Sequence, residues 1–191
     1  MGENYFTNPA LFVINVLFDL YILAVMLRFI LQWLRADFRN PLAQVLVKVT
    51  NPPLKPLRRF IPGYGGIDFA SIVLMVVLQL IALLLISLLQ GSSTQAGVLF
   101  FLALAELLSL FINIFIFAIF VQVIISWVNP GSYSPATALL QSLTEPLLRP
   151  ARNRIPAVAG LDLSPLVVLV VLQLAKMLLI PPITQLAAFV T

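Results

Sequence analysis

Long apolar stretches alternate with short polar segments along this chain, and the alternation predicts its main elements. A helix needs about 20 apolar residues to cross the hydrocarbon core of a bilayer. Four stretches reach that length, at roughly residues 10–33, 69–90, 98–127 and 165–189. The pattern therefore predicts an all-α membrane protein with four transmembrane helices. Pro181 and Pro182 interrupt the last stretch, so we expect a kink or a helix end there.

The polar segments that separate the first two stretches and the last two stretches are copies of each other. Residues 33–80 are repeated at residues 127–174 with a constant offset of 94 and no gap. This regularity predicts two tandem helical hairpins, residues 1–96 and 97–191, that meet similar physical demands. Each hairpin has two spans, so both copies should share one orientation, unlike the inverted repeats of many transporters.

Each polar segment opens with an N-cap residue followed by proline, Asn40-Pro41 in one copy and Ser134-Pro135 in the other. Apolar residues then recur at helical spacing, which predicts a short amphipathic helix. We expect this helix to lie in the inner membrane interface, to pack on the spans as a lid, or both. In the first copy its apolar positions are Leu42, Val45, Leu46 and Val49.

Prolines follow every few residues after these apolar positions. Because proline lacks an N–H and clashes with the preceding turn, we expect each segment to break and turn rather than continue as one helix. The prolines concerned are Pro52, Pro53 and Pro56, then Pro146 and Pro150. An aspartate precedes the second span of each copy, and we interpret both aspartates, Asp68 and Asp162, as helix N-caps.

Basic residues are concentrated in the two polar segments. The positive-inside rule therefore places both segments in the cytoplasm and both termini outside. The first span has no basic region before it, which favours a retained membrane helix over a cleaved signal peptide. Nine of the eleven Lys and Arg residues lie in these segments: Arg35, Arg39, Lys48, Lys55, Arg58, Arg59, Arg149, Arg152 and Arg154.

Seven of these side chains form the first candidate site. They either bind anionic lipid headgroups or a cytoplasmic partner protein, or they act only as a topology signal. We expect no nucleic acid partner, because the basic cluster lies against a membrane. The seven residues are Lys48, Lys55, Arg58, Arg59, Arg149, Arg152 and Arg154.

Polar side chains inside the spans form the second candidate site: Asp19, Glu106, Asn113, Gln79, Gln173 and Lys176. In a structural interpretation these groups hold the bundle together by hydrogen bonds, and Lys176 pairs with Asp19 or Glu106. In a functional interpretation they line a path for an ion or proton, with both carboxylates titrating. A third interpretation is an intramembrane contact with a partner. Arg28, near the end of its span, is expected to snorkel to the interface.

The composition excludes several kinds of chemistry. The chain has no histidine and no cysteine, which removes the commonest general base, thiolate nucleophiles and most metal and haem ligands. The carboxylates inside the spans are isolated rather than paired. We therefore expect no enzyme, no cofactor and no catalytic residues.

The repeated motif resembles the YggT family. It reads Thr-x-Pro-x-Leu-Lys/Arg-Pro-x-Arg, then Ile-Pro, then Gly-x-Asp before an apolar helix that contains a glutamine. It runs from Thr50 to Gln79 and again from Thr144 to Gln173. The resemblance implies a double-repeat protein of the bacterial inner membrane, in a family associated with osmotic or ion stress and, in plastids, with haem attachment to cytochrome b6f and with nucleoid organisation.

These observations favour a non-enzymatic organising or assembly factor of the inner membrane, whose basic cytoplasmic face engages anionic lipid or a partner protein. The alternative is a small channel or transporter that contributes to osmotic or ion homeostasis. Membrane lipids are the expected partners, and a four-span bundle is thin enough that a homo-oligomer or a larger membrane complex is expected.

Overall fold

The computed structural model describes residues 3–92, 94–129, 131, 133–155 and 162–189. The described chain is helical, apart from turns and one isolated bridge between Tyr64 and Ile67. Its helices are α1 (Glu3–Trp33), α2 (Pro41–Phe60), α3 (Phe69–Leu89), α4 (Ala96–Val128), α5 (Pro135–Arg152) and α6 (Ser164–Ala188).

Four of these helices are long and apolar enough to cross a membrane, which confirms the predicted all-α membrane architecture. They correspond to Asn8–Trp33, Phe69–Leu89, Ala96–Val128 and Ser164–Ala188. The predicted spans agree with these bounds to within about two residues, which is the usual uncertainty of helix ends.

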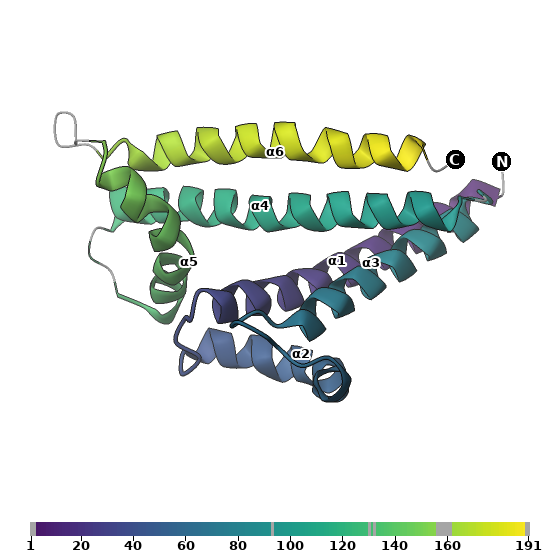
Figure 1. The fold of residues 1–191 in the computed structure, drawn as a ribbon, viewed down its shortest axis with the longest axis horizontal. Coiled ribbons are helices and arrows are strands. Elements are labelled where there is room, and N and C mark those ends of the chain that lie inside the picture. The colour runs from purple at the N-terminus through teal and green to yellow at the C-terminus, as the bar shows by residue number, and fades with distance from the viewer. Residues whose placement is uncertain (1–2, 93, 130, 132, 156–161, 190–191) are drawn as a thin grey trace.

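The two repeats form two hairpins that run in the same direction (Figure 1). Helix α1 packs against α3, α4 packs against α6, and α3 contacts α4 to join the hairpins. The short helices α2 and α5 lie together at one end of the spans, and the start of α1 and the end of α6 lie at the other (Figure 1). The repeats are parallel, as predicted from the even number of spans in each copy.

One hydrophobic core crosses the boundary between the repeats. Ile22, Val25 and Ile30 of α1 are almost fully buried and belong to the same cluster as Phe115 of α4 and Leu143 of α5. Burying an aliphatic or aromatic side chain of this size stabilises a fold by about 1.5–3 kcal/mol relative to water. The shared cluster makes the two hairpins a single packed body.

The prediction that prolines break the polar segments is wrong. Helix α2 continues through Pro52, Pro53 and Pro56, and α5 continues through Pro146 and Pro150. Figure 1 shows that α2 changes direction along its length, as expected of a proline-kinked helix. At the paired prolines of α6 we expected a kink or a helix end, and the helix end is excluded because α6 continues through them to Ala188.

Side chains from the neighbouring span help α2 to tolerate its prolines. Pro53 has no N–H, so the carbonyl of Val49 loses its normal donor one turn later. The hydroxyl of Tyr21 on α1 donates to that carbonyl at 3.3 Å. A side chain from another helix thus supplies a hydrogen-bond donor to the Val49 carbonyl, which Pro53 would otherwise leave without one.

The starts of α2 and α5 are capped as predicted. The Asn40 side chain accepts a hydrogen bond from the Leu42 N–H at 2.9 Å. Ser134 forms a reciprocal capping box with Thr137. The Asn40 amide also donates to the Pro135 carbonyl at 2.7 Å, so the two caps join the repeats at this end of the molecule.

Candidate functional site: a basic face and an intramembrane polar cavity

An arginine and an aspartate ten residues apart form an ion pair in each repeat. Arg58 at the end of α2 is paired with Asp68, which precedes α3, and Arg152 is paired with Asp162, which precedes α6. The first pair is the more buried, since the Asp68 side chain is 3% exposed and that of Asp162 is 43% exposed. Each pair fixes the exit from the short helix to the span that follows.

A tight turn brings Asp68 to its arginine. Gly65 and Gly66 have φ angles of 63° and 84°, in the left-handed region that glycine adopts without steric cost. Tyr64 and Ile67 exchange backbone hydrogen bonds across this turn. The corresponding glycine of the second copy, Gly160, lies outside the described residues.

Of the two aspartates predicted as helix N-caps, Asp68 occupies that position and Asp162 does not, so the prediction is wrong for Asp162. Asp68 occupies the N-cap position of α3, and its carboxylate accepts hydrogen bonds from Arg58 and from the Ser71 hydroxyl. Asp162 accepts from the Ser164 backbone N–H at 2.9 Å, one residue earlier than the N-cap position. Burial would raise the pKa of Asp68, but the hydrogen bonds from Arg58 and Ser71 hold it below its usual value.

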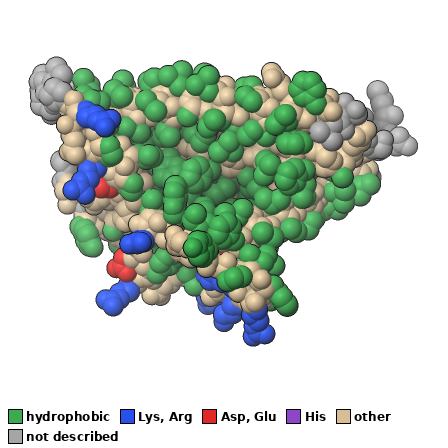
Figure 2. Space-filling model, in the orientation of Figure 1, with side chains coloured by type: hydrophobic (Ala, Val, Ile, Leu, Met, Phe, Trp, Pro, Cys, Tyr) green, Lys and Arg blue, Asp and Glu red, His purple; other side chains and the backbone are tan. Residues whose placement is uncertain are grey.

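Six of the seven predicted lipid-binding cations are exposed, and five of these six have no hydrogen-bonding or ion-pair partner among the described residues. We call them the basic face: Lys48, Lys55, Arg59, Arg149 and Arg154. Figure 2 shows Lys and Arg side chains gathered at the end of the molecule formed by α2 and α5. The other two cations, Arg58 and Arg152, are the ion-paired residues, so the structure divides the predicted set into two roles.

Helix α2 presents three different faces. Ala43, Thr50 and Leu54 are buried against the spans. A second, apolar face is exposed, and it carries Leu42, Val45 and Val49. Lys48, Lys55 and Arg59 project from a third face, which carries the charge. A helix with one packed, one apolar and one basic face suits a membrane interface.

Arg28 does not snorkel to the interface, so that prediction is wrong. The residue is 4% exposed, and its Nη1 donates to the Thr50 hydroxyl oxygen at 2.7 Å, beneath α2. Its Nε is buried without a partner among the described residues. Sequence reasoning missed this contact because Arg28 falls just outside the aligned repeat, although the repeated Thr50 and Thr144 were a signal that this position has a role.

The second candidate site is an intramembrane cavity of about 430 Å³ between α1, α3 and α4. The structure brings four of the six predicted intramembrane residues to its wall, together with Asn15 and Ser109: Asp19, Gln79, Glu106 and Asn113. The Gln79 amide donates to the Glu106 carboxylate. Gln173 is exposed on α6 and is not part of the cavity wall.

Lys176 pairs with neither of the carboxylates that the sequence suggested. Its Nζ donates to the Asn113 side-chain oxygen at 2.9 Å, which links α6 to α4 within the second repeat. Asn113 also lines the cavity, so Lys176 contacts a residue of the cavity wall without lining the cavity itself. At the equivalent positions, offset by 94, the first repeat has Asp19 and Ala82 in place of Asn113 and Lys176.

These two arrangements offer ligands for charged groups. The described residues contain no cluster of three or more carboxylate, imidazole or thiol side chains that would suit a metal ion. The basic face supplies cationic donors at one end of the spans, and the cavity supplies carboxylates and amides within the bilayer.

A family model described as CCB3/YggT matches the chain twice, at residues 7–89 and 101–183. An uncharacterized protein of Pseudomonas aeruginosa is 47% identical over 175 residues, covering 91% of this chain and 89% of the relative. A protein of Vibrio alginolyticus named for the proC 3′ region is 42% identical, with 90% and 94% covered. The uncharacterized protein YggT of Escherichia coli K12 is 36% identical, with 89% and 88% covered. No solved structure matches the chain.

Proposed function

Since the chain belongs to the CCB3/YggT family, we propose that it is a non-enzymatic organising factor of the bacterial inner membrane whose basic face engages anionic lipid headgroups. In this proposal α2 and α5 face the cytoplasm, in accordance with the positive-inside rule. The anionic lipids that gather at the basic face then form a surface on which partner membrane proteins assemble.

The observation that carries the proposal is that the basic face has no carboxylate partner within the described part of the chain and lies beside an exposed apolar surface. Leu42, Val45 and Val49 are each about half exposed, on the flank of α2 next to its lysines. Apolar side chains seat a helix at the boundary of the acyl chains, and its cations then meet phosphate groups. Each cation near an anionic surface contributes about 1 kcal/mol of attraction.

The test uses the purified full-length protein in nanodiscs of phosphatidylethanolamine, with or without phosphatidylglycerol. We expect the anionic lipid to raise the thermal unfolding midpoint at low salt, and high salt to reduce the effect. Replacing all five residues of the basic face by glutamine should abolish the lipid dependence. The control replaces Gln44 and Gln141, exposed neutral residues on α2 and α5, by serine and should leave the dependence intact. An undiminished lipid dependence in the five-residue variant would overturn the proposal.

The intramembrane cavity supports a second candidate function, a small channel or transporter. Its wall carries two carboxylates, Asp19 and Glu106, in a space large enough for several water molecules. Ionisable groups within spans mark ion or proton paths by default. In liposomes that contain only this protein, ion flux lost on Asp19→Asn or Glu106→Gln would establish transport. Gln173→Asn, outside the cavity wall, is the control, and absence of flux from folded wild-type protein would exclude the candidate.

A further inference from the structure

The two repeats differ at one buried position beneath their short helices. Arg28 reaches the Thr50 hydroxyl in the first repeat, and the equivalent residue Gln122 is hydrogen-bonded to the Thr144 hydroxyl in the second. One turn later, Gln32 accepts a hydrogen bond from the first repeat's ion-paired arginine at 3.2 Å. Its equivalent, offset by 94, is only a serine, Ser126.

Shorter side chains at these two positions leave space in the second repeat. A cavity of about 570 Å³ lies between α4, α5 and α6, and both Gln122 and Ser126 line it. Apolar side chains of α4 and α6 form most of the remaining wall: Phe120, Val123, Trp127, Pro165, Leu166 and Leu169. Its volume falls within the range of about 300–1,000 Å³ that is typical of small-molecule sites.

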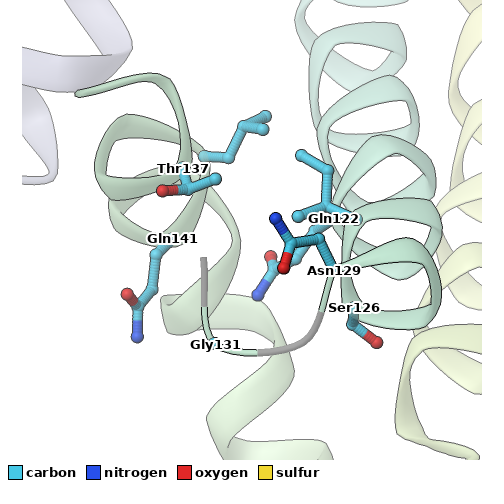
Figure 3. Close-up of a pocket in the computed structure, with 8 residues that line it drawn as sticks. Gln122, Ser126, Asn129, Gly131, Thr137 and Gln141 are labelled. Carbon is cyan, nitrogen blue, oxygen red and sulfur yellow. The ribbon is translucent and has the colours of Figure 1, made fainter. Parts of the chain in front are cut away.

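The polar end of this cavity carries the Asp162 carboxylate and two side chains with unused hydrogen-bond donors, Arg152 and Gln122. Arg152 donates through Nε to Asp162 and through Nη1 to Glu145, which leaves Nη2 without a partner among the described residues. The Gln122 side chain accepts from Thr144 and keeps its amide N–H groups. Gln122 and Ser126 also line a smaller pocket between α4 and α5, although the Ser126 side chain points away from Thr137 and Gln141 in Figure 3.

We propose that this cavity of the second repeat is a discrete phospholipid site, with the phosphate near Arg152 and one acyl chain between α4 and α6. The inference rests on the proposed function to the extent that both place this end of the molecule at headgroup level. It adds a single bound lipid at one repeat to the diffuse attraction of the basic face.

The chemistry of the cavity favours a phospholipid over other occupants. Phosphate and ester oxygens only accept hydrogen bonds, and the unused groups at Gln122 and Arg152 are donors. The apolar wall continues along α4 and α6 in the direction that an acyl chain takes in a bilayer.

The first repeat supplies the variant that tests the site. Gln122→Arg with Ser126→Gln installs the side chains of the first repeat and should fill the cavity. Native mass spectrometry of the protein from phosphatidylglycerol nanodiscs should show one tightly retained phospholipid on the wild type and its loss from the double variant. Gln44→Arg adds the same charge at an exposed position of α2 and should retain the lipid. Equal lipid retention by the wild type and a folded double variant would overturn the proposal.

A second measurement needs no substitution. Phosphatidylglycerol with a photoreactive acyl chain should label residues 120–127 and 163–169 of the wild type preferentially. Diacylglycerol carrying the same photoreactive chain, which lacks the phosphate, should not show this preference. Uniform labelling of all four spans by both lipids would contradict the site.

The outcomes also separate this site from the proposed function. A double variant that loses the retained lipid while its unfolding still depends on anionic lipid supports both statements. Neutralising the basic face should remove the lipid dependence of unfolding and leave the single retained lipid in place. Loss of the retained lipid in that five-residue variant would contradict a discrete site.

Discussion

The Arg58 guanidinium is ion-paired with the buried carboxylate of Asp68, and this contact ties the end of α2 to the start of α3. Gln32 of α1 accepts from the same arginine, so three helices meet at one cation. Arg152 and Asp162 repeat the pair in a more exposed setting. One contact in two environments allows the effect of burial to be measured within a single chain.

Asp68→Asn should destabilise the protein more than Asp162→Asn. The first change removes the charge partner of Arg58 in a buried site, and we expect a loss of about 2 kcal/mol in the free energy of unfolding. The second breaks a pair whose side chains are both well exposed, and about 0.5 kcal/mol is expected. Chemical denaturation in detergent, followed by circular dichroism, measures both. Equal losses would show that burial does not decide the strength of these pairs.

The ion pair between Asp68 and Arg58 should also make the stability of the protein fall in acid. The pKa of Asp68 in the fold lies below its ordinary value of 3.8. Stability from such a carboxylate is fully present above its unfolded pKa and is lost as the pH falls through the folded pKa. The stability difference between wild type and Asp68→Asn should therefore be constant from neutral pH to about pH 4 and should shrink below it. A difference that stayed constant into more acidic solution would contradict the assignment.

The architecture could be predicted from the sequence because its signals are local. Apolar length gives the spans, and the duplication gives the parallel hairpins. The continuity of α2 could not be predicted, because the Val49 carbonyl left free by Pro53 is satisfied by Tyr21 from another helix. A rule about proline within one segment cannot include a donor that lies 28 residues earlier in the chain.

The candidate site shows the same division between local and long-range information. Asp19 and Glu106 were identified because charge within a span is visible in sequence, and the structure places them on one cavity. The partner of Lys176 was predicted wrongly because charge complementarity favours a carboxylate, whereas helix packing puts Asn113 within reach. The pairing of Arg58 with Asp68 was missed, although the constant ten-residue spacing in both copies was a usable signal.

The contact between Arg28 and Thr50 predicts that substitutions of its two partners lower the free energy of unfolding by unequal amounts. Arg28→Gln should cost only about 1 kcal/mol, because in the second repeat a glutamine at the equivalent position, Gln122, reaches the equivalent threonine, Thr144. Thr50→Val should cost about 2–3 kcal/mol, because it removes the hydroxyl from a buried guanidinium whose Nε already lacks a partner among the described residues. Thr144→Val is the matched control with a neutral partner, and about 1 kcal/mol is expected. The measurement is unfolding in detergent, and a Thr50→Val loss no larger than that of Thr144→Val would refute the argument.

The hydrogen bond from Lys176 to Asn113 predicts which changes of Asn113 the bundle tolerates. Asn113→Leu removes the acceptor of an ammonium group between α4 and α6, and we expect a loss of about 1–2 kcal/mol. Asn113→Asp should be tolerated, because it supplies a carboxylate to Lys176, and because the first repeat already has aspartate at the equivalent position 19. A double-mutant cycle with Lys176→Met isolates the interaction from the effects of each change alone. A coupling energy near zero in that cycle would show that Lys176 and Asn113 contribute independently, and that the ammonium group is stabilised by other means.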